Sequence, residues 1–198
     1  MRPLNVLGVS SSMRERSFGT RTLKMVLDTA QKYEAKTRLL ELRKVMMPLF
    51  NPDSSSMQSD MNIQNVTEDI NWADAFILVS PDYHGSISGS MKNFLDYYWE
   101  EFAGKTFGYI CTSHEKGLTV MDQMRTAVRQ CYGWSLPYGI SVNGGEDFNE
   151  TGELVNSVLE KRLRMLARDL VVYGKVIREQ FLEDLSSNEA DTFVARYR

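Results

Sequence analysis

Cysteine and histidine are scarce in this chain, and their scarcity excludes several kinds of protein. The two cysteines, Cys111 and Cys131, form no CxxC pair, so we expect reduced thiols rather than a disulfide scaffold. The two histidines and the lack of a Cys/His cluster argue against a metal site. No stretch approaches the roughly 20 apolar residues of a membrane helix, and the N-terminal apolar run is too short for a signal peptide. These features predict a cytoplasmic protein without a membrane partner.

Two common nucleotide-binding motifs are also missing. The sequence has no GxxxxGK[ST] segment, which argues against a P-loop. Only Gly8 and Gly19 lie near the first apolar run, and they do not form the GxGxxG of a tightly bound Rossmann dinucleotide. The formal net charge of -3 gives no general attraction for nucleic acid, which we therefore do not expect as a partner.

Short apolar runs alternate along the chain with segments of helical period. The runs that predict strands are Val6–Ser10, Arg38–Leu42, Ala75–Ser80, Phe107–Thr112 and Leu136–Val142. The segments that predict helices are Leu23–Tyr33, Asn62–Trp72, Ser88–Trp99, Leu118–Cys131 and Gly152–Gly174. This alternation predicts an α/β fold, with a parallel sheet covered by helices on both faces. The length suits one domain over residues 1–198, in which 175–198 form a polar tail on the surface or against a partner.

The alternation also predicts where a ligand binds. In an open parallel sheet, ligands lie beyond the carboxyl ends of the strands, where the strand order reverses. For a five-stranded sheet of order 2-1-3-4-5, that place is between the first and third strands. The loops that follow Ser10 and Ser80 are therefore the candidates.

The loop after Ser10 is rich in hydroxyl groups, carries Arg14 and Arg16, and leads into a helix. The free N–H groups and the dipole at a helix N-terminus favour an anion, and a guanidinium adds charge-assisted hydrogen bonds. This loop therefore predicts a phosphate site. The alternative is that Ser17 caps the helix while the arginines are solvated.

The loop after Ser80 runs from Pro81 to Gly89 and combines turn formers with flat side chains. Proline and glycine fix a sharp backbone path, and the rings of Tyr83 and His84 suit a planar ligand. The alternative is a plain strand-to-helix turn in which Ser88 caps the helix.

Several segments, spread over about residues 4–173, resemble the NADPH-dependent FMN reductase family. Residues 11–19, SSMRERSFG, resemble the family's phosphate loop G-S-x-R-x-x-S-F-N. Residues 81–97, PDYHGSISGSMKNFLDY, resemble its P-E-Y-N-G-S-x-P-G-x-L-K-N-x-x-D-W. Residues 148–154, FNETGEL, are similar to its F-D-x-x-G-x-L. The second segment is the longest and the most specific of the three.

The resemblance implies a flavodoxin-like three-layer sandwich that binds FMN and assembles as a homodimer or homotetramer. It implies hydride transfer from NADPH or NADH to FMN, and onward transfer to a small acceptor such as a quinone, free flavin, azo compound or metal oxyanion. It implies that the phosphate is held by Ser12, Arg14, Ser17, Gly19 and Thr20. It implies that the isoalloxazine ring is flanked by Pro81, Asp82, Tyr83, His84 and Gly85, with Ser113 on its far side. No residue is assigned as catalytic, because the flavin carries the chemistry.

Five positions depart from the family's pattern. Ser11 and Gly19 stand where the family has Gly and Asn, Asp82 and His84 where it has Glu and Asn, and Ser88 where Pro is usual. The change at Gly19 removes a side chain that would contact the phosphate. We hypothesise that His84 tunes the flavin's potential or its pH dependence.

The sequence leaves two other functions open, a non-enzymatic electron carrier like flavodoxin and a redox sensor that holds FMN without turnover. The hydroxyl-rich loop with Arg14, together with the 81–86 segment, favours the reductase, and a carrier is usually more acidic. The preferred nicotinamide, the tightness of FMN binding and the physiological acceptor are not determined by the sequence.

Four methionines lie in or near the loop after the second strand, namely Met46, Met47, Met57 and Met61. They line either a partner subunit or an adaptable acceptor pocket, or they serve core packing and loop surface. The pattern alone does not decide between these interpretations.

Overall fold

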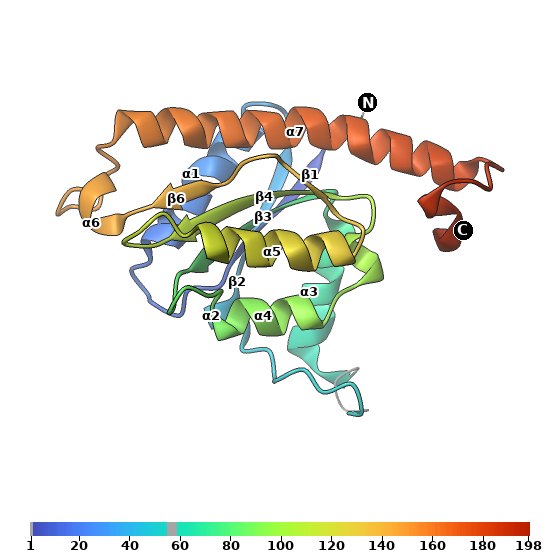
Figure 1. Ribbon diagram of the computed structural model, residues 1–198, viewed down its shortest axis with the longest axis horizontal. Helices are drawn as coiled ribbons and strands as arrows, with labels where there is room; N and C mark the ends of the chain where they lie inside the picture. The colour runs from blue at the N-terminus through green and yellow to red at the C-terminus, as the bar shows by residue number, and fades with distance from the viewer. Residues whose placement is uncertain (1, 55–58) are drawn as a thin grey trace.

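A computed structural model describes residues 2–54 and 59–198, so Met57 lies outside the described residues (Figure 1). The strands are β1 (Asn5–Ser10), β2 (Lys36–Glu41), β3 (Ala75–Pro81), β4 (Thr106–Thr112), β5 (Trp134–Ser135) and β6 (Ile140–Val142). They pair in parallel in the order β2-β1-β3-β4-β5, and β6 also pairs with β4. The predicted flavodoxin-like strand order is thereby confirmed.

The fifth position of the sheet holds two short strands, so the continuous strand predicted over Leu136–Val142 is wrong. β5 pairs with the start of β4, and β6 pairs with its end. Between them, the N–H of Leu136 still donates to the carbonyl of Phe107 at 2.9 Å. The next residue is Pro137, which has no N–H to donate, so the ladder breaks there.

The helices include two short ones that the sequence did not predict, α2 and α6. The helices described are α1 (Phe18–Gln31), α2 (Leu42–Val45), α3 (Met61–Trp72), α4 (Gly89–Asp96), α5 (Leu118–Gln130), α6 (Gly144–Asp147) and α7 (Ser157–Ser186), with 3-10 turns η2 (Glu100–Phe102) and η3 (Phe193–Tyr197). The last helix was predicted to start at Gly152, but that residue lies in a turn with a φ of 79°. Helix α7 starts at Ser157 because the Asn156 side chain accepts hydrogen bonds from the N–H groups of the first turn.

Helices cover both faces of the sheet, as Figure 1 shows, with α1 and α7 on one side and α3, α4 and α5 on the other. Side chains alternate along β3, so Ala75, Ile77 and Val79 pack toward α1 and α7. Phe76 and Leu78 pack toward the opposite layer. All five are at most 1% exposed, which explains why this strand is a continuous apolar run.

The two ends of the chain are tied to the amino edge of the sheet. Asp74, just before β3 and only 3% exposed, accepts hydrogen bonds from Arg2 at 2.6 and 2.8 Å and from Arg178 at 3.2 Å. At the other end, η3 folds back below α7 and buries Val194 in a cluster with Ala103 and Phe181 (Figure 1). Residues 175–198 thus complete α7 and return against it.

Within the described ranges, no helix combines the length and the apolar character needed to cross a membrane. The carboxyl ends of the strands lie at the left of Figure 1, opposite the two chain ends. The loops after β1, β3, β4 and β6 meet at this edge and line one common cleft.

Candidate active site

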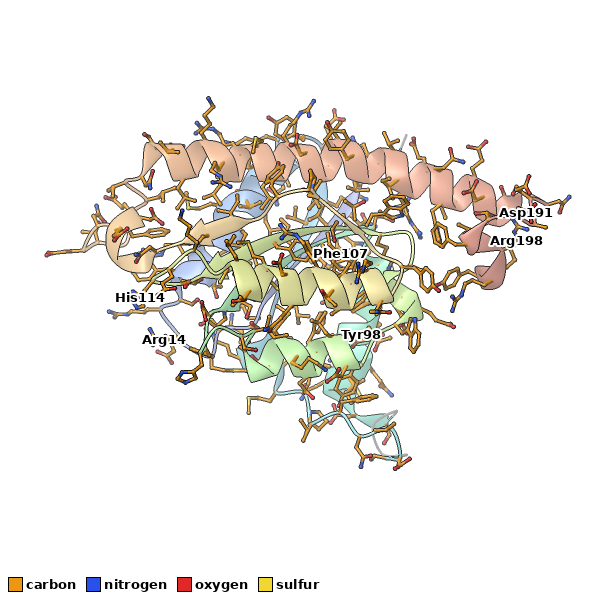
Figure 2. The ribbon with its side chains drawn as sticks, viewed as in Figure 1. Arg14, Tyr98, Phe107, His114, Asp191 and Arg198 are labelled. Atoms are coloured by element: carbon orange, nitrogen blue, oxygen red, sulfur yellow. The ribbon has the colours of Figure 1, made fainter. Side chains whose placement is uncertain are left out.

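The cleft at the carboxyl edge has a volume of about 190 Å³. Its lining residues come from four loops and are Ser12, Arg14, Arg16, Ser17, Phe18, Pro81, Asp82, Tyr83, Thr112, Ser113, His114, Gly144 and Gly145. Figure 2 shows Arg14 and His114 at this same end of the molecule. The cleft lies where a parallel sheet of this order is expected to bind a ligand.

Most of the residues proposed from sequence meet in this cleft. The ones that line it are Ser12, Arg14, Ser17, Pro81, Asp82, Tyr83 and Ser113. The ones that do not are Gly19, Thr20, His84 and Gly85. The contacts of these four show what each does beside the cleft.

Ser17 closes the first loop by capping α1. Its hydroxyl oxygen accepts a hydrogen bond from the N–H of Thr20 at 3.2 Å, and the first turn of the helix carries no acidic residue. In the part of the chain that the structure describes, the N–H groups of Phe18 and Gly19 have no acceptor. The cap and the anion site are therefore compatible, because two helix N–H groups stay available.

Two positive charges stand beside these free N–H groups. The side chains of Arg14 and Arg16 are exposed, and neither forms an ion pair within residues 2–54 and 59–198. Uncompensated guanidinium groups next to a helix N-terminus attract an anion and bind its oxygens with charge-assisted hydrogen bonds. This part of the cleft suits a phosphate group.

Gly19 and Thr20 form the floor below the loop. A Cβ atom on Gly19 would lie 2.6 Å from Oγ1 of Thr112 and 3.0 Å from Cγ1 of Val79, so a side chain there would displace the strands' side chains. The hydroxyl of Thr20 is buried and lies 2.7 Å from the hydroxyl of Ser10. The departure from Asn to Gly at position 19 therefore has a packing reason.

Asp82 connects the loop after β3 to the loop after β4. One carboxylate oxygen accepts a hydrogen bond from the N–H of Gly85 at 2.8 Å, and the other accepts one from the hydroxyl of Ser113 at 3.0 Å. The N–H of Asp82 also donates to the carbonyl of Thr112 at 2.9 Å. These bonds fix the two loops that the resemblance places on opposite sides of the flavin ring.

A tight hairpin presents Tyr83 to the cleft. Tyr83 and Ser86 exchange two backbone hydrogen bonds of 3.0 and 3.2 Å, and His84 and Gly85 form the tip with φ values of 59° and 75°. Two consecutive positive φ values match a type I′ turn, in which Asn-Gly is the preferred pair. His84 occupies the position of that Asn, is exposed, and does not line the cleft.

A network of serine hydroxyls joins the two ligand loops from below. Ser88 caps α4 by accepting from the N–H of Met91 at 3.2 Å, and it donates its own hydroxyl hydrogen to Ser11 at 2.7 Å. The N–H and hydroxyl of Ser11 both donate to the carbonyl of Val79, at 3.0 and 3.1 Å. The N–H of Ser88 donates to the hydroxyl of Ser80 at 3.0 Å. The helix cap at Ser88, which the sequence left open as the alternative role of this loop, is present.

The sequence prediction missed the contribution of the loop after β6. Gly144 and Gly145 line the cleft, and a Cβ on Gly144 would lie 2.2 Å from the ring of Phe18. The signal was available, because Gly144 and Gly145 follow the predicted strand after one residue, and a glycine pair there indicates a close approach of the backbone. His114 was also missed, although it follows Ser113 at the same edge of the sheet.

Cys111 lies behind this site, in β4, and is fully buried. Burial, aided by the nearby charge of Asp82, raises the pKa of its thiol to about 12. The thiol therefore stays protonated and packs in the core.

Comparison with known proteins identifies the family. The family of NADPH-dependent FMN reductases matches residues 4–147 of the chain. The chain belongs to this family. An NADPH azoreductase of Bacillus sp. (strain OY1-2) is 25% identical over 173 residues, which are 85% of this chain and 94% of the relative. An NAD(P)H-dependent FAD/FMN reductase of Geobacillus thermodenitrificans is 24% identical over 176 residues, which are 85% of this chain and 92% of the relative.

Solved structures support the same fold. FerB, a flavoenzyme NAD(P)H:acceptor oxidoreductase from Paracoccus denitrificans, superposes with a TM-score of 0.71 at 19% identity, covering 87% of this chain and 98% of FerB. As a member of the NADPH-dependent FMN reductase family, the chain is an oxidoreductase that uses FMN and a reduced nicotinamide. Membership favours the enzyme over the carrier and the sensor.

Proposed function

We propose that the enzyme holds FMN in the carboxyl-edge cleft and passes electrons from NADPH, or from NADH, to a small acceptor. The uncompensated pair Arg14 and Arg16, beside the free N–H groups at the start of α1, is the observation that carries this proposal. It supports a doubly charged phosphate monoester as the anchor of the ligand.

The residues divide into two groups around the proposed FMN. Phosphate contacts come from Ser12, Arg14, Ser17 and the backbone N–H of Gly19. Thr20 supports them from beneath the cleft, because its N–H donates to Ser17 and its hydroxyl bonds to Ser10. The ring is flanked by Pro81, Asp82, Tyr83, His84 and Gly85, with Ser113 opposite them. His84 takes part from the hairpin tip, outside the cleft lining, where it sets the turn.

When bound, FMN supplies hydride acceptance and donation, so the chain needs no nucleophile and no acid–base pair. The contribution of the chain is to bind and to orient. Asp82 holds the N–H of Gly85 and the hydroxyl of Ser113 in fixed positions, so the loops on the two sides of the ring site keep their positions relative to each other. The serine network below keeps the two loops at a constant spacing.

We propose an aromatic acceptor, an azo compound or a quinone, ahead of free flavin or a metal oxyanion. The relatives named as azoreductases support this choice. The resemblance to the azoreductase of Bacillus sp. extends over 85% of this chain.

We also propose a homodimer, or a tetramer built from it, in the cytoplasm. A groove of about 900 Å³ runs between α4 and α5, and its lining includes Ile87, Leu95 and Trp99, the last of which is 60% exposed. A large apolar hollow of this kind favours coverage by a second copy. Light scattering of the protein and of Trp99→Glu tests this, with a dimer mass expected only for the unchanged protein. The free cysteines support the location.

The decisive experiment is an absorbance spectrum of the purified protein, followed by NADPH without oxygen. We expect flavin bands, present on purification or after addition of FMN, that bleach on addition of NADPH. If the flavin bands persist with NADPH, NADH is added next. Bands that persist with both would contradict electron entry from a reduced nicotinamide. A colourless protein that takes up no added FMN would contradict the cleft assignment.

A further inference from the structure

A second, smaller hollow lies next to the cleft. It measures about 110 Å³ and is lined by Met13, Leu42, Met46, Met47, Ser90 and Asn93. These residues come from the loop after β1, from α2 and its end, and from the first turns of α4. The proposed flavin site does not use any of them.

The hollow and the cleft share a wall. Met13 lines the hollow, while the preceding residue, Ser12, lines the cleft. Ser90 on the far side of the hollow donates its hydroxyl hydrogen to the carbonyl of Ser11 at 2.7 Å. The backbone of residues 11–13 therefore separates the two spaces, and a ligand that crosses this rim can touch both.

The hollow offers apolar surface to a ligand. Its amide side chain, Asn93, accepts from the N–H of Phe50 and donates to the carbonyl of Pro48, both at 2.8 Å. The hydroxyl of Ser90 is used by Ser11. The polar groups are thus occupied by the protein, and among the described residues no charged side chain lines the space. What remains is the surface of three thioethers and one leucine.

Thioethers exposed to water point to a ligand of particular chemistry. Met13 is 51% exposed and Met46 is 70% exposed. Methionine adapts its shape and forms favourable sulfur–aromatic contacts. These side chains therefore suit a flat aromatic ring better than a phosphate or a sugar.

The rim of the hollow is held in place from α4. Tyr97 donates its hydroxyl hydrogen to the carbonyl of Pro48 at 3.0 Å, and its ring meets that of Phe50 edge to face at 5.1 Å. Met46 ends α2 with a φ of 50°, and its N–H donates to the carbonyl of Leu42 at 3.2 Å. This left-handed backbone conformation is a common way to end a helix, and it fixes the direction from which the Met46 side chain reaches the hollow.

We propose that the hollow is a subsite for one ring of an aromatic electron acceptor, whose reducible part lies in the neighbouring cleft. The role of the ligand as acceptor rests on the proposed function. Closed apolar cavities of roughly 150 Å³ bind benzene, so an open hollow of about 110 Å³ fits a single ring. The subsite would favour acceptors with two or more rings over small anions.

Binding is tested without turnover by methyl NMR. The protein is labelled with ¹³C at its methionine methyl groups, assigned by single Met→Leu variants, and titrated with 2-methylnaphthalene, which flavin does not reduce. We expect saturable shifts at Met13, Met46 and Met47. Met61 and Met165, which are 66% and 42% exposed but line no part of the hollow, are internal controls. Shifts of the controls as large as the others, or no shift at the three methionines, would overturn the proposal.

Kinetics provide the second test, with a matched pair of variants. Met46→Gln should raise the KM for 2-methyl-1,4-naphthoquinone about three- to tenfold, because sulfur–ring contacts and apolar area are lost, while kcat and the KM for ferricyanide stay unchanged. Leu49→Gln, on the same loop and 82% exposed, should change neither KM. Equal effects on both acceptors, or in both variants, would contradict the subsite. Failure of the proposed function has a different signature, namely no bleaching of flavin by NADPH while the NMR shifts persist.

Discussion

Ser88 donates its hydroxyl hydrogen to the hydroxyl of Ser11 across 2.7 Å, although the two residues are 77 positions apart. They are 3% and 0% exposed. Both stand at positions where this chain departs from the pattern of its family, which has Pro and Gly there. Proline at 88 would also remove the N–H that donates to Ser80. The two departures are therefore one structural feature.

A double-mutant cycle measures this coupling. Ser88→Ala should lower the free energy of unfolding by roughly 1–2 kcal/mol, because it removes a helix cap and a buried hydrogen bond. The double variant with Ser11→Ala should cost about 0.5–1.5 kcal/mol less than the sum of the single variants. Urea unfolding gives the values, with Ser157→Ala as an exposed control. Strict additivity would show that the two hydroxyls do not interact.

Arg14 is expected to contribute binding energy for FMN rather than stability. Arg14→Gln should raise the dissociation constant of FMN about ten- to hundredfold, because one charge-assisted hydrogen bond is lost. Quenching of FMN fluorescence measures the constant at several salt concentrations. Lys36→Gln, an exposed cation at the other edge of the sheet, is the matched control. If both changes raised the dissociation constant equally, Arg14 would act only through the net charge of the protein and not through a direct contact with FMN.

Asp82 is expected to act through the two loops that it joins. Asp82→Ala removes the acceptor for Gly85 and for Ser113, and should weaken FMN binding roughly tenfold. Asp82→Asn keeps one carbonyl oxygen and should fall between Ala and the unchanged protein. Titration with FMN separates the three proteins. Identical affinities would show that the loops hold their positions without the carboxylate.

His84 sits at a turn position that asparagine prefers. Since asparagine tolerates a positive φ better, His84→Asn should raise the free energy of unfolding by about 0.5 kcal/mol. The same variant tests whether the imidazole tunes the flavin, by measurement of its potential between pH 5 and 8. Glu34→Asn, at another exposed position of positive φ that does not line the cleft, serves as the control. An unchanged potential at every pH would remove the tuning hypothesis and leave the turn effect.

Lys105 provides a test of pH dependence far from the cleft. It is 5% exposed, and its ammonium donates to the carbonyl of Ile70 at 2.8 Å. Burial, aided by the charge of Arg178, lowers its pKa from 10.5 to about 8. Between these two values the unfolded chain holds the proton and the folded chain does not, so stability rises with pH in that window.

Tyrosines and other residues also titrate in this pH range. Comparison with Lys105→Met separates the contribution of Lys105 from theirs. The stability of the unchanged protein minus that of the variant should increase by on the order of 3 kcal/mol between pH 8 and 10.5. Guanidinium unfolding at several pH values gives this difference. A flat difference would mean that the buried lysine keeps its ordinary pKa.

Local patterns predicted the sheet and the place of the cleft because both depend on short stretches of sequence. β3 is a continuous apolar run, and the loops after Ser10 and Ser80 follow directly from strand ends. The break at Pro137 was visible in the sequence, but the apolar pattern around it masked the missing donor. The apolar period predicted that α7 starts at Gly152. The helix starts later because Asn156 caps it.

Contacts between distant segments could not be predicted in this way. The need for glycine at position 19 comes from Thr112, and the partner of Ser11 is Ser88. The hollow at Met13 forms only when α2 and α4 meet. Each of these depends on a distance in space that no spacing along the chain encodes.

The anchoring of both chain ends has a practical consequence. Arg2 is bound to Asp74, and Val194 is buried beside Phe181, both at the edge opposite the cleft. A protein tethered through either terminus, to an electrode or to a carrier protein, therefore presents its carboxyl-edge cleft to the surrounding solution. Deletion of residues 187–198 would instead expose the apolar surface that Val194 covers and promote aggregation.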